Sequence, residues 1–405
     1  MNKKISLRLL QAVQGLSLVV FLAGLSGCQS SDTQPINMQL TDTQHIEGKF
    51  TPPDGKALLF MGQDSDTLSD YVEAVPEDNI EAVTLYTQLK HANPDKTLYG
   101  VYAPADWHAG TVDFGATLAE SPKAALAIGL AFDQCDGGVH AENIAQGVYD
   151  SSLTKLTDYF KSIAPRKVFL RIGYEFDGAW NCYKPESYKA AYRYIAQNIS
   201  AAGVTNVATV WQSATWPDAT VAGDNASLYD HTMPGFLDSW YPGDDVVDWV
   251  GVSVFYRDLS QWNYTPPDTP ARAQETLLTF ARNHTKPVMI AEAAPQGYRV
   301  GALTHSVIQQ NAQTPVTAER IWRDWYAPFF EFIYSNSDVI RAVAYINAHW
   351  ETQGMWECNP GVAAGQEGCN SGNWGDSRVQ ANPLIKQRWL EQVNNNAHWV
   401  QHSDY

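Results

Sequence analysis

Short apolar runs recur along the whole chain and alternate with segments of helical periodicity. There are eight of these runs, and they begin at Ala57, Thr97, Ala124, Lys167, Val207, Asp248, Pro287 and Ala342. Strands that are apolar along their length are typical of a parallel sheet that is covered on both faces. Eight such strands, each followed by a helix, close into a (β/α)₈ barrel. The sequence therefore predicts an α/β fold with TIM-barrel architecture.

The segments between the runs carry the start signals and spacing of amphipathic helices. Asp150 is a candidate helix cap, Pro185 suits the first turn of a helix, Thr317 begins a third helix, and Trp389 lies within the last. An open, doubly wound sheet is the competing architecture. The barrel is favoured because no glycine-rich phosphate turn follows the first run, and because eight units use the whole chain after residue 55.

Composition narrows the classes of partner. The formal net charge of −17 over 405 residues argues against nucleic acid, whose phosphates require a basic surface. The chain contains 14 Trp, and such residues often form flat binding surfaces. There is no GxGxxG motif, no phosphate loop and no metal-ligand spacing of His residues, so neither a cofactor nor a metal is expected.

The N-terminal residues have the pattern of an export signal. Lys3 and Arg8 belong to a positively charged start, which the apolar stretch Leu16–Leu25 follows. The sequence LSGC, which ends at Cys28, resembles the cleavage box of bacterial lipoproteins, and this implies that Cys28 carries a lipid. Gln29 then suggests an outer-membrane or cell-surface location. The alternative is an ordinary secretory signal in which Cys28 is incidental.

This pattern divides the chain into three parts. Residues 1–27 are interpreted as a lipoprotein signal peptide, residues 28–55 as a flexible tether, and residues 56–405 as a single barrel domain. The tether is polar and shows little periodicity. We expect an exported monomer that meets the membrane only through its lipid anchor.

Four further cysteines would reach an oxidising compartment, where disulfides form. They are Cys135, Cys182, Cys358 and Cys369, which allow three connectivities. Cys358 and Cys369 flank a glycine-rich loop and are the easiest pair to close, which leaves Cys135 with Cys182. Four free, buried thiols are the alternative.

The run KVFLRIGYEF carries a glutamate, Glu175, directly after FLRIGY at its end. Side chains alternate along a strand, so Arg171, Gly173 and Glu175 share one face, while the aliphatic residues between Lys167 and Gly173 form the other. We expect the aliphatic face to pack on helices, so Arg171 and Glu175 would lie inside the barrel. Gly173 would leave space between them.

A second run, PVMIAEAA, also carries a glutamate near its end, Glu292, directly after VMIA. The same alternation places Val288, Ile290 and Glu292 on one face and predicts that Glu292 points inward. Two carboxylates across one barrel mouth suit glycosidic cleavage, in which one protonates the leaving oxygen and the other attacks or activates water. The alternative is a structural ion pair of each glutamate with a basic residue such as Arg171.

The sequence around these glutamates resembles a known family. The order of the two glutamates is that of the retaining (β/α)₈ glycoside hydrolases of clan A. The stretch YDSSLTKLTDYFKSIAPRKVFLRIGYEFDGAWN resembles glycoside hydrolase family 26, which has an Arg four residues before the acid/base and a Gly-x-Trp after it, as at Arg171, Glu175 and Gly178–Trp180. The segments that begin at Tyr241 and Lys286 resemble its sixth and seventh strands. The likeness covers roughly residues 56 to 395.

The resemblance implies an activity and two catalytic roles. Glu175 would be the general acid/base and Glu292 the nucleophile of a retaining, endo-acting hydrolase that works by double displacement. The implied substrate is a β-linked plant or algal cell-wall polysaccharide or its oligosaccharides, a β-mannan or a β-1,3-xylan. No cofactor is implied.

The resemblance also implies residues that contact the sugar. Tyr256 resembles the tyrosine that hydrogen-bonds to the nucleophile, and Trp350 resembles the indole beneath the sugar at the cleavage point. Trp211, Trp107 and His108 are further candidates for lining the cleft, and ordinary packing is the alternative for each aromatic ring. The expected substrate-binding residues are Arg171, Tyr174, Trp180, Trp107, His108, Trp211, Tyr256 and Trp350.

The residue before the acid/base departs from the family pattern. It is usually His in family 26 and Asn in much of the clan, whereas here it is Tyr174. A phenol cannot reproduce the donor–acceptor pair of an amide, so the sugar bound there is expected to differ. A marine galactan such as agar or carrageenan is the alternative substrate, with Arg257 and Arg299 as candidate sulfate ligands.

Two other functions would use the same residues. A surface glycan-binding lipoprotein could use a barrel without turnover, although a pure binder has no need of two strand-end glutamates. A transglycosylase would keep every residue named above. The sequence favours the hydrolase.

Overall fold

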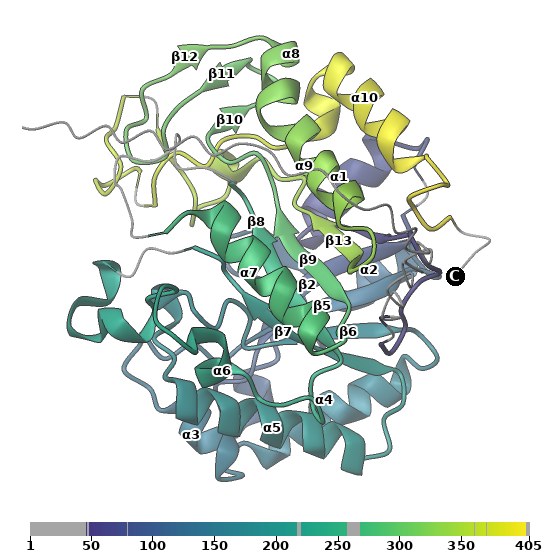
Figure 1. Ribbon diagram of the computed structural model, residues 1–405, viewed down its shortest axis with the longest axis vertical. Coiled ribbons are helices and arrows are strands. Elements are labelled where there is room, and N and C mark those ends of the chain that lie inside the picture. Colours follow the sequence, from purple (N-terminus) through teal and green to yellow (C-terminus); the bar gives the residue numbers. More distant parts are fainter. Residues whose placement is uncertain are drawn as a thin grey trace, which may run out of the picture. The chain divides into compact units, whose positions relative to one another are not determined.

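A closed barrel of eight parallel strands forms the centre of the protein (Figure 1). This computed structural model describes residues 46, 48–78, 80–216, 220–256, 268–359, 361–369 and 371–401. Around the barrel the strands follow the order β1, β2, β5, β6, β7, β8, β9 and β13, and β13 then pairs with β1. Their bounds are Leu58–Met61, Ala82–Gln88, Ala125–Ala131, Val168–Ile172, Val207–Ser213, Trp249–Val254, Val288–Ala293 and Ile340–Tyr345. The predicted TIM-barrel fold is confirmed.

Helices connect the strands and lie outside the barrel (Figure 1). The α-helices α1 to α10 span Ser65–Ala74, Phe114–Glu120, His140–Ala145, Asp150–Ser162, Pro185–Ala201, Phe236–Trp240, Pro270–Asn283, Ala318–Ile321, Ala327–Ser335 and Pro383–Val393. A π-helical turn, Trp322–Tyr326, joins α8 to α9. As predicted, α5 begins at Pro185, Thr317 caps α8, and α10 contains Trp389. Asp150 is the first residue of α4, and the cap position before it is Tyr149.

Short strands in the loops form two small antiparallel sheets. β3 (Ala105–Asp106) pairs with β4 (Thr111–Val112). β10 (Tyr298–Arg299), β11 (Thr304–His305) and β12 (Thr314–Pro315) form the other sheet. Both lie in segments that follow barrel strands, β2 in the first case and β9 in the second. They give shape to the loops at that end of the barrel.

Seven of the eight predicted strands are present, and the second was placed wrongly. Residues 97–103 form turns and bends, because Leu98 and Gly100 both have left-handed backbone conformations, with φ of 55° and 79°. The second barrel strand is instead β2, whose threonines interrupt its apolar residues. Thr84 and Thr87 are nevertheless buried, so the polar letters of β2 do not mark an exposed face.

The barrel interior is packed by a small number of large side chains among many alanines. Leu58, Phe60, Phe169, Trp249 and Met289 belong to this inner cluster. The ring of Phe169 meets those of Phe60 and Trp249 edge-to-face, with centroids 5.2 Å apart in both pairs. A second, larger cluster lies between the strands and the surrounding helices. The lower barrel is therefore a packed core.

The chain just before β1 belongs to the barrel domain and not to a tether. The Phe50 ring packs on Phe169 at 6.0 Å, and the Trp249 indole donates a hydrogen bond to the carbonyl of Lys49 at 2.7 Å. The buried guanidinium of Arg341 donates to the carbonyls of Pro52 and Lys56. The predicted boundary at residue 55 is therefore too late for residues 48–55, which close the base of the barrel.

The predicted signal peptide, the lipidation site Cys28 and the first part of the tether lie outside the described residues. Within those that are described, no helix is both long and apolar enough to cross a membrane. The two predicted disulfides, Cys135–Cys182 and Cys358–Cys369, are both present. Each one joins parts of the loops at the barrel mouth.

Candidate active site

A cavity of about 470 Å³ opens where the carboxyl ends of the barrel strands meet. Glu175 and Glu292 both line it, which confirms that the two strand-end glutamates share one site. The remaining lining residues are mostly aromatic or uncharged: Gln63, Trp180, Ala214, Thr215, Trp216, Ser253, Phe255, Tyr256, Pro270, Gln274, Gln296, Ile346, Trp350, Trp356, Ser371 and Trp374. We call this space the active-site cavity.

Glu175 lies in a tight turn after β6 and not within the strand. Its φ of 52° is left-handed, which is uncommon for a residue other than glycine and occurs often at functional sites. The turn is held because its carbonyl accepts hydrogen bonds from the Gly178 amide and the Asn181 side chain, both at 2.9 Å. Gly173 is required for a different reason from the one predicted, because a Cβ there would come within 2.5 Å of the Phe132 ring.

The Glu175 carboxyl receives only uncharged donors. The Ser253 hydroxyl donates to one oxygen at 2.8 Å, and the Trp180 indole donates to the other at 3.2 Å. Burial and then the charge of Glu292 raise the pKa of Glu175 to about 8, against an ordinary value of 4.5. At neutral pH this group therefore holds its proton, which is the state that a general acid requires.

The inward direction of the Glu292 side chain does not follow from simple alternation of side chains along β9. Val288 and Ile290 point outward into the helix-facing core, while Met289 and Ala291 point into the barrel. The register between β8 and β9 then shifts by one residue, so that Ser253 pairs with Glu292. Such a bulge places two neighbouring residues on one face. Glu292 points inward as predicted, but it does so because of the bulge, since Val288 and Ile290 lie on the opposite face.

The Glu292 carboxylate is held by a fully buried arginine. Arg171 donates to one of its oxygens, and the Gln212 amide lies 3.4 Å from the same oxygen. Arg171 also donates to Gln212 at 2.7 Å and to the Tyr86 hydroxyl at 3.1 Å. A permanent positive charge therefore balances Glu292 and orients it, as a nucleophile requires.

Two polar residues connect the glutamates, and the sequence analysis did not identify them. Gln212, on β7, donates to the Ser253 hydroxyl at 3.0 Å, and Ser253, on β8, donates to Glu175. Arg171, Gln212 and Ser253 thus form one chain of hydrogen bonds between the carboxyls. The sequence contained a signal for both residues. Gln212 and Ser253 are polar residues within apolar runs, and polar side chains that face a barrel interior are unusual.

Trp211 was predicted as a candidate for the cleft wall, and this prediction was wrong. Gln212 points into the barrel, so Trp211, the preceding residue, points outward. Its indole is fully buried and stacks on the Phe176 ring, with centroids 4.4 Å apart and planes 6° from parallel. It is part of the packing between the barrel and its helices.

Three predicted aromatic residues do line the active-site cavity. Trp350 begins a short 3₁₀ helix after β13, and Tyr256 follows β8, where its ring meets Trp216 edge-to-face at 5.7 Å. Trp180 is 46% exposed, the most exposed Trp among the described residues, so its indole borders the cavity as well as holding Glu175.

Trp107 and His108 lie elsewhere. Trp107 borders a separate hollow of about 480 Å³ that it shares with Gln88 and Tyr99. His108 is exposed, and its carbonyl accepts a hydrogen bond from the Met355 amide at 2.6 Å. Neither residue lines the active-site cavity, so their predicted contact with the cleft was wrong. His108 instead supports the loop after β13.

Tyr174 lies beside the site without lining the cavity. Its ring meets Tyr86 edge-to-face at 5.3 Å, and the Arg171 guanidinium lies over both rings, 5.2 Å from Tyr174 and 4.9 Å from Tyr86. Such cation–π contacts stabilise a desolvated guanidinium. The departure from the family pattern, Tyr174, therefore changes what packs around Arg171. Arg171 in turn donates a hydrogen bond to Glu292.

A third buried carboxylate, Asp177, lies two residues after Glu175. It accepts hydrogen bonds from the Ser213 hydroxyl at 2.5 Å and the Ala214 amide at 2.6 Å, and His231 lies 3.0 Å away. Asp177 ties the turn that carries Glu175 to the end of β7. Its negative charge also contributes to the raised pKa of Glu175.

Comparison with known proteins identifies the family. No family model matches the chain. A β-1,3-xylanase from a Vibrio species is 33% identical over 362 residues, which cover 89% of this chain and 69% of the relative. The chain belongs to the glycoside hydrolase family of this enzyme. A β-1,3-xylanase from an Alcaligenes species is 34% identical over 354 residues, 86% of this chain and 66% of that relative. This glycoside hydrolase thus spans about two thirds of each relative's length.

Solved structures of similar fold are more distant in sequence. A family 26 β-mannanase from Bacteroides ovatus is 13% identical, with a TM-score of 0.50, over 89% of this chain and 93% of that one. The catalytic domain of an endo-β-1,4-mannanase from Bacillus sp. JAMB-750 is 14% identical, with a TM-score of 0.51, over 89% and 90%. The predicted resemblance to family 26 barrels is confirmed at the level of the fold.

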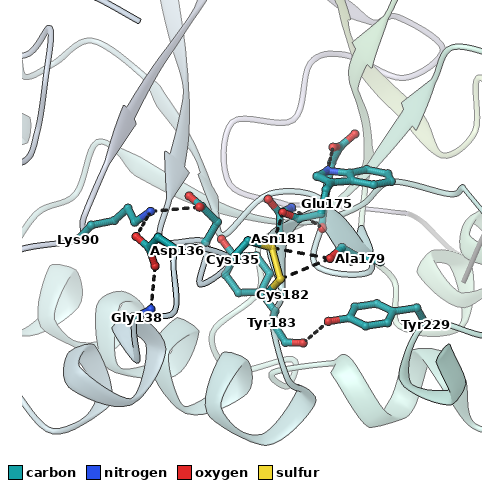
Figure 2. The surroundings of a disulfide bond; sticks show 12 residues. Lys90, Cys135, Asp136, Gly138, Glu175, Ala179, Asn181, Cys182, Tyr183 and Tyr229 are labelled. Carbon is teal, nitrogen blue, oxygen red and sulfur yellow. Dashed lines mark hydrogen bonds and ion pairs between the residues drawn. A yellow bond between two sulfur atoms is a disulfide. The ribbon is translucent and has the colours of Figure 1, made fainter. Parts of the chain in front are cut away.

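One disulfide of the glycoside hydrolase supports the turn that carries the acid/base candidate. Figure 2 shows the Cys135–Cys182 bond between the loop after β5 and the turn that contains Glu175. Cys182 directly follows Asn181, whose carbonyl accepts a hydrogen bond from the Gln134 amide at 2.9 Å. The β5 loop is itself anchored by Lys90, which pairs with Asp136 at 2.8 Å. The disulfide therefore fixes the Glu175 turn to a second strand end.

The structure offers no obvious metal site in this region. Among the residues it describes, no group of three or more His, Cys, Asp and Glu side chains is placed to hold a metal ion. The acid residues at the mouth are accounted for by hydrogen bonds and by Arg171.

The raised pKa of Glu175 predicts a pH-dependent difference in stability. The folded protein holds this proton up to about pH 8, whereas the unfolded chain loses it near pH 4.5. Stability therefore falls as pH rises through this window. The unfolding free energy of Glu175→Gln minus that of the wild type should therefore increase from pH 5 to pH 8. The total increase should be about 2–5 kcal/mol. Denaturant unfolding at several pH values measures this.

The exposed Glu331 provides the matched control for this experiment. Glu331→Gln should show no pH-dependent difference from the wild type over the same range. A difference for Glu175→Gln that stayed constant from pH 5 to pH 8 would contradict the raised pKa.

The disulfide beside Glu175 predicts a combined effect on stability and turnover. The double variant Cys135→Ser, Cys182→Ser should lose about 2–4 kcal/mol of unfolding free energy. Its kcat should also fall at temperatures where circular dichroism shows it to be folded, because the Glu175 turn is no longer held. Unchanged kcat in the folded variant would limit the disulfide to a stabilising role.

Proposed function

We propose that the protein is a retaining, endo-acting β-1,3-xylanase in which Glu175 is the general acid/base and Glu292 the nucleophile. The observation that carries this proposal is the difference between the two carboxyls of one cavity. Glu175 has uncharged donors and a pKa of about 8, while Glu292 contacts a buried arginine. The charge of Glu292 is the second largest cause of the raised pKa of Glu175, as expected for the close carboxyl pair of a retaining enzyme.

The first half of the reaction follows from these states. Glu292 attacks the anomeric carbon and forms a covalent glycosyl ester. At the same time Glu175 donates its proton to the glycosidic oxygen as the carbon–oxygen bond breaks, and the leaving chain departs with a new hydroxyl group. Ser253 and Trp180 hold the two oxygens of Glu175 throughout, so the proton is presented in a fixed direction.

The second half reverses the role of Glu175. Once Glu292 is esterified it no longer carries a negative charge, so one main cause of the raised pKa of Glu175 disappears. Glu175 can now remain a carboxylate, and it takes a proton from the attacking water. The water oxygen replaces the ester, and Glu292 returns to its ion pair with Arg171.

The substrate assignment depends on the relatives and on the character of the cavity wall. Both curated relatives are named β-1,3-xylanases, and the active-site cavity presents several indole rings, which suit the apolar faces of neutral pyranoses. A β-mannan remains the second candidate, because the structural neighbours are named mannanases.

A sulfated galactan has less support. Arg299 was a candidate sulfate ligand, but it forms a mostly buried ion pair with Glu351, to which it donates through Nε at 2.6 Å. Its charge is therefore already balanced within the protein. The other candidate, Arg257, lies outside the described residues.

Release of reducing ends from a panel of polysaccharides tests the substrate. The panel contains β-1,3-xylan, β-1,4-xylan, β-mannan, agar and carrageenan, and the highest kcat/KM is expected on β-1,3-xylan. Faster cleavage of mannan would reassign the substrate, and products longer than the starting oligosaccharide would indicate transglycosylation. Tight binding without new reducing ends across the panel would favour a glycan-binding protein.

Two variants and the anomeric form of the first product test the mechanism. Glu175→Ala and Glu292→Ala should each lower kcat by about 10²-fold or more, while Glu331→Gln should retain wild-type activity. Azide should partly restore turnover of Glu175→Ala on a substrate with a good leaving group, because that variant lacks only the base for the second step. The initial product should be the β-anomer by NMR, and an initial α-anomer would refute retention.

We further propose that Cys28 carries a lipid that anchors the protein at the outer membrane or cell surface. The LSGC sequence supports this proposal. The wild type should be found in the membrane fraction and should incorporate labelled palmitate in a bacterial host. Cys28→Ala should be unlabelled, and equal labelling of both forms would refute the assignment.

A further inference from the structure

The loop after β13 carries two tryptophans that line the active-site cavity and have no assigned role. Trp356 and Trp374 form an edge-to-face pair with ring centroids 4.9 Å apart. Trp374 also meets Trp350 edge-to-face at 6.2 Å, so the three indoles form a continuous wall. This wall is built entirely from residues 350–374, which follow a single strand.

The loop holds this wall in a fixed shape. Cys358 and Cys369 are joined by a disulfide between the two tryptophans in sequence. The Trp374 indole donates to the carbonyl of Ser371 at 2.9 Å, and the Ser371 hydroxyl donates to the carbonyl of Met355 at 3.1 Å. The rings are therefore ordered before any ligand arrives, which lowers the entropic cost of binding.

The exposure of the pair distinguishes it from structural tryptophans. The core indoles are fully buried, as at Trp211, Trp240, Trp249, Trp389 and Trp399. Trp356 and Trp374 are half-buried and face open space beside the catalytic glutamates. Leaving such large apolar faces against water costs free energy, which a stacked sugar ring would recover.

Trp374 lies beside the loop that follows β9, because its carbonyl accepts a hydrogen bond from the Gly297 amide at 2.9 Å. β6, which leads to Glu175 and Trp180, is the fourth strand from β13 in either direction around the eight-stranded barrel. Trp180 binds the residue that protonates the leaving oxygen, so its side of the cavity receives the leaving part of the chain. The side of β13 neighbours β9, which carries Glu292, and receives the part that becomes attached to the nucleophile.

We propose that Trp356 and Trp374 form a binding subsite for a neutral pyranose of the β-linked chain, beyond the cleaved sugar on the nucleophile side, and that the Cys358–Cys369 disulfide maintains it. The direction assigned to the subsite rests on the proposed retaining mechanism. The existence of a sugar-binding surface does not depend on which polysaccharide is cleaved. The subsite would make long chains better substrates than short ones.

Substrate length is the variable that tests this proposal. In Trp356→Ala and Trp374→Ala, kcat/KM on the polymer and on long oligosaccharides should fall about tenfold or more. For the shortest oligosaccharide that the wild type cleaves, kcat/KM should change by less than about twofold. Trp356→Phe, which keeps an aromatic face, should recover most of the loss. An equal loss on every substrate length would refute the subsite and indicate a structural role.

Two further variants complete the design. If the disulfide maintains the wall, the double variant Cys358→Ser, Cys369→Ser should show the same length-dependent loss of kcat/KM as the tryptophan variants. Trp322→Ala is the matched control, because Trp322 is also half-buried but stacks on Tyr326 in the outer helical layer. It should leave the length dependence unchanged, and thermal unfolding of each variant checks that it is folded.

Binding measurements separate this inference from the proposed function. In an inactive Glu292→Gln background, calorimetry should show that Trp356→Ala weakens binding of a long oligosaccharide from whichever polysaccharide the wild type cleaves or binds. If β-1,3-xylan is not a substrate but this loss is observed, the proposed function fails and the subsite stands. If xylan is cleaved and neither variant changes length dependence or binding, the subsite alone is wrong.

Discussion

The buried ion pair of Arg171 with Glu292 is the interaction on which the rest of the site depends. A guanidinium without solvent exposure is very costly unless each donor finds an acceptor. Here Arg171 donates to Glu292, Gln212 and Tyr86, and two tyrosine rings lie beneath it. These partners come from β9, β7 and β2. The requirement to satisfy one cation therefore connects opposite sides of the barrel and fixes the direction of Glu292, the proposed nucleophile.

The same cation determines which carboxyl keeps a proton. Asp177 and the two glutamates lie near the mouth, and Arg171 balances the charge of only Glu292. Asp177 is stabilised by the Ser213 hydroxyl, a backbone amide and the nearby His231, and Glu292 takes the arginine. Glu175 has only uncharged donors in a buried position beside a negative charge, which is why its pKa rises. The proposed acid and the proposed nucleophile are thus distinguished by their partners and not by residue type.

Much of this arrangement could be predicted from sequence, and each failure has a physical cause. Apolar runs predicted seven strands and placed both glutamates at strand ends, and the number and spacing of the cysteines predicted both disulfides. β2 was missed because its threonines interrupt the apolar pattern although they are buried, while the apolar residues around Leu98 lie in a turn. The inward direction of Glu292 was predicted from strict alternation, but a bulge reverses that alternation, and a bulge leaves no mark in one sequence. Trp211 faces the helices because its neighbour on β7, Gln212, is the residue that faces inward.

The strand ends carry the proposed reacting groups, and the longer loops carry the residues that are proposed to bind the sugar. The carboxyls and their partners lie on strand ends or in the turn that directly follows β6, where hydrogen bonds between elements fix them. The cavity wall comes from longer loops, which alone would be free to move. Both described disulfides lie in such loops, one beside Trp180 and the other between Trp356 and Trp374. Because these disulfides order the cavity walls during folding, a polysaccharide that bound there would not have to order the walls. In the proposed subsite, the covalent links therefore favour binding of an extended substrate as well as stability of the fold.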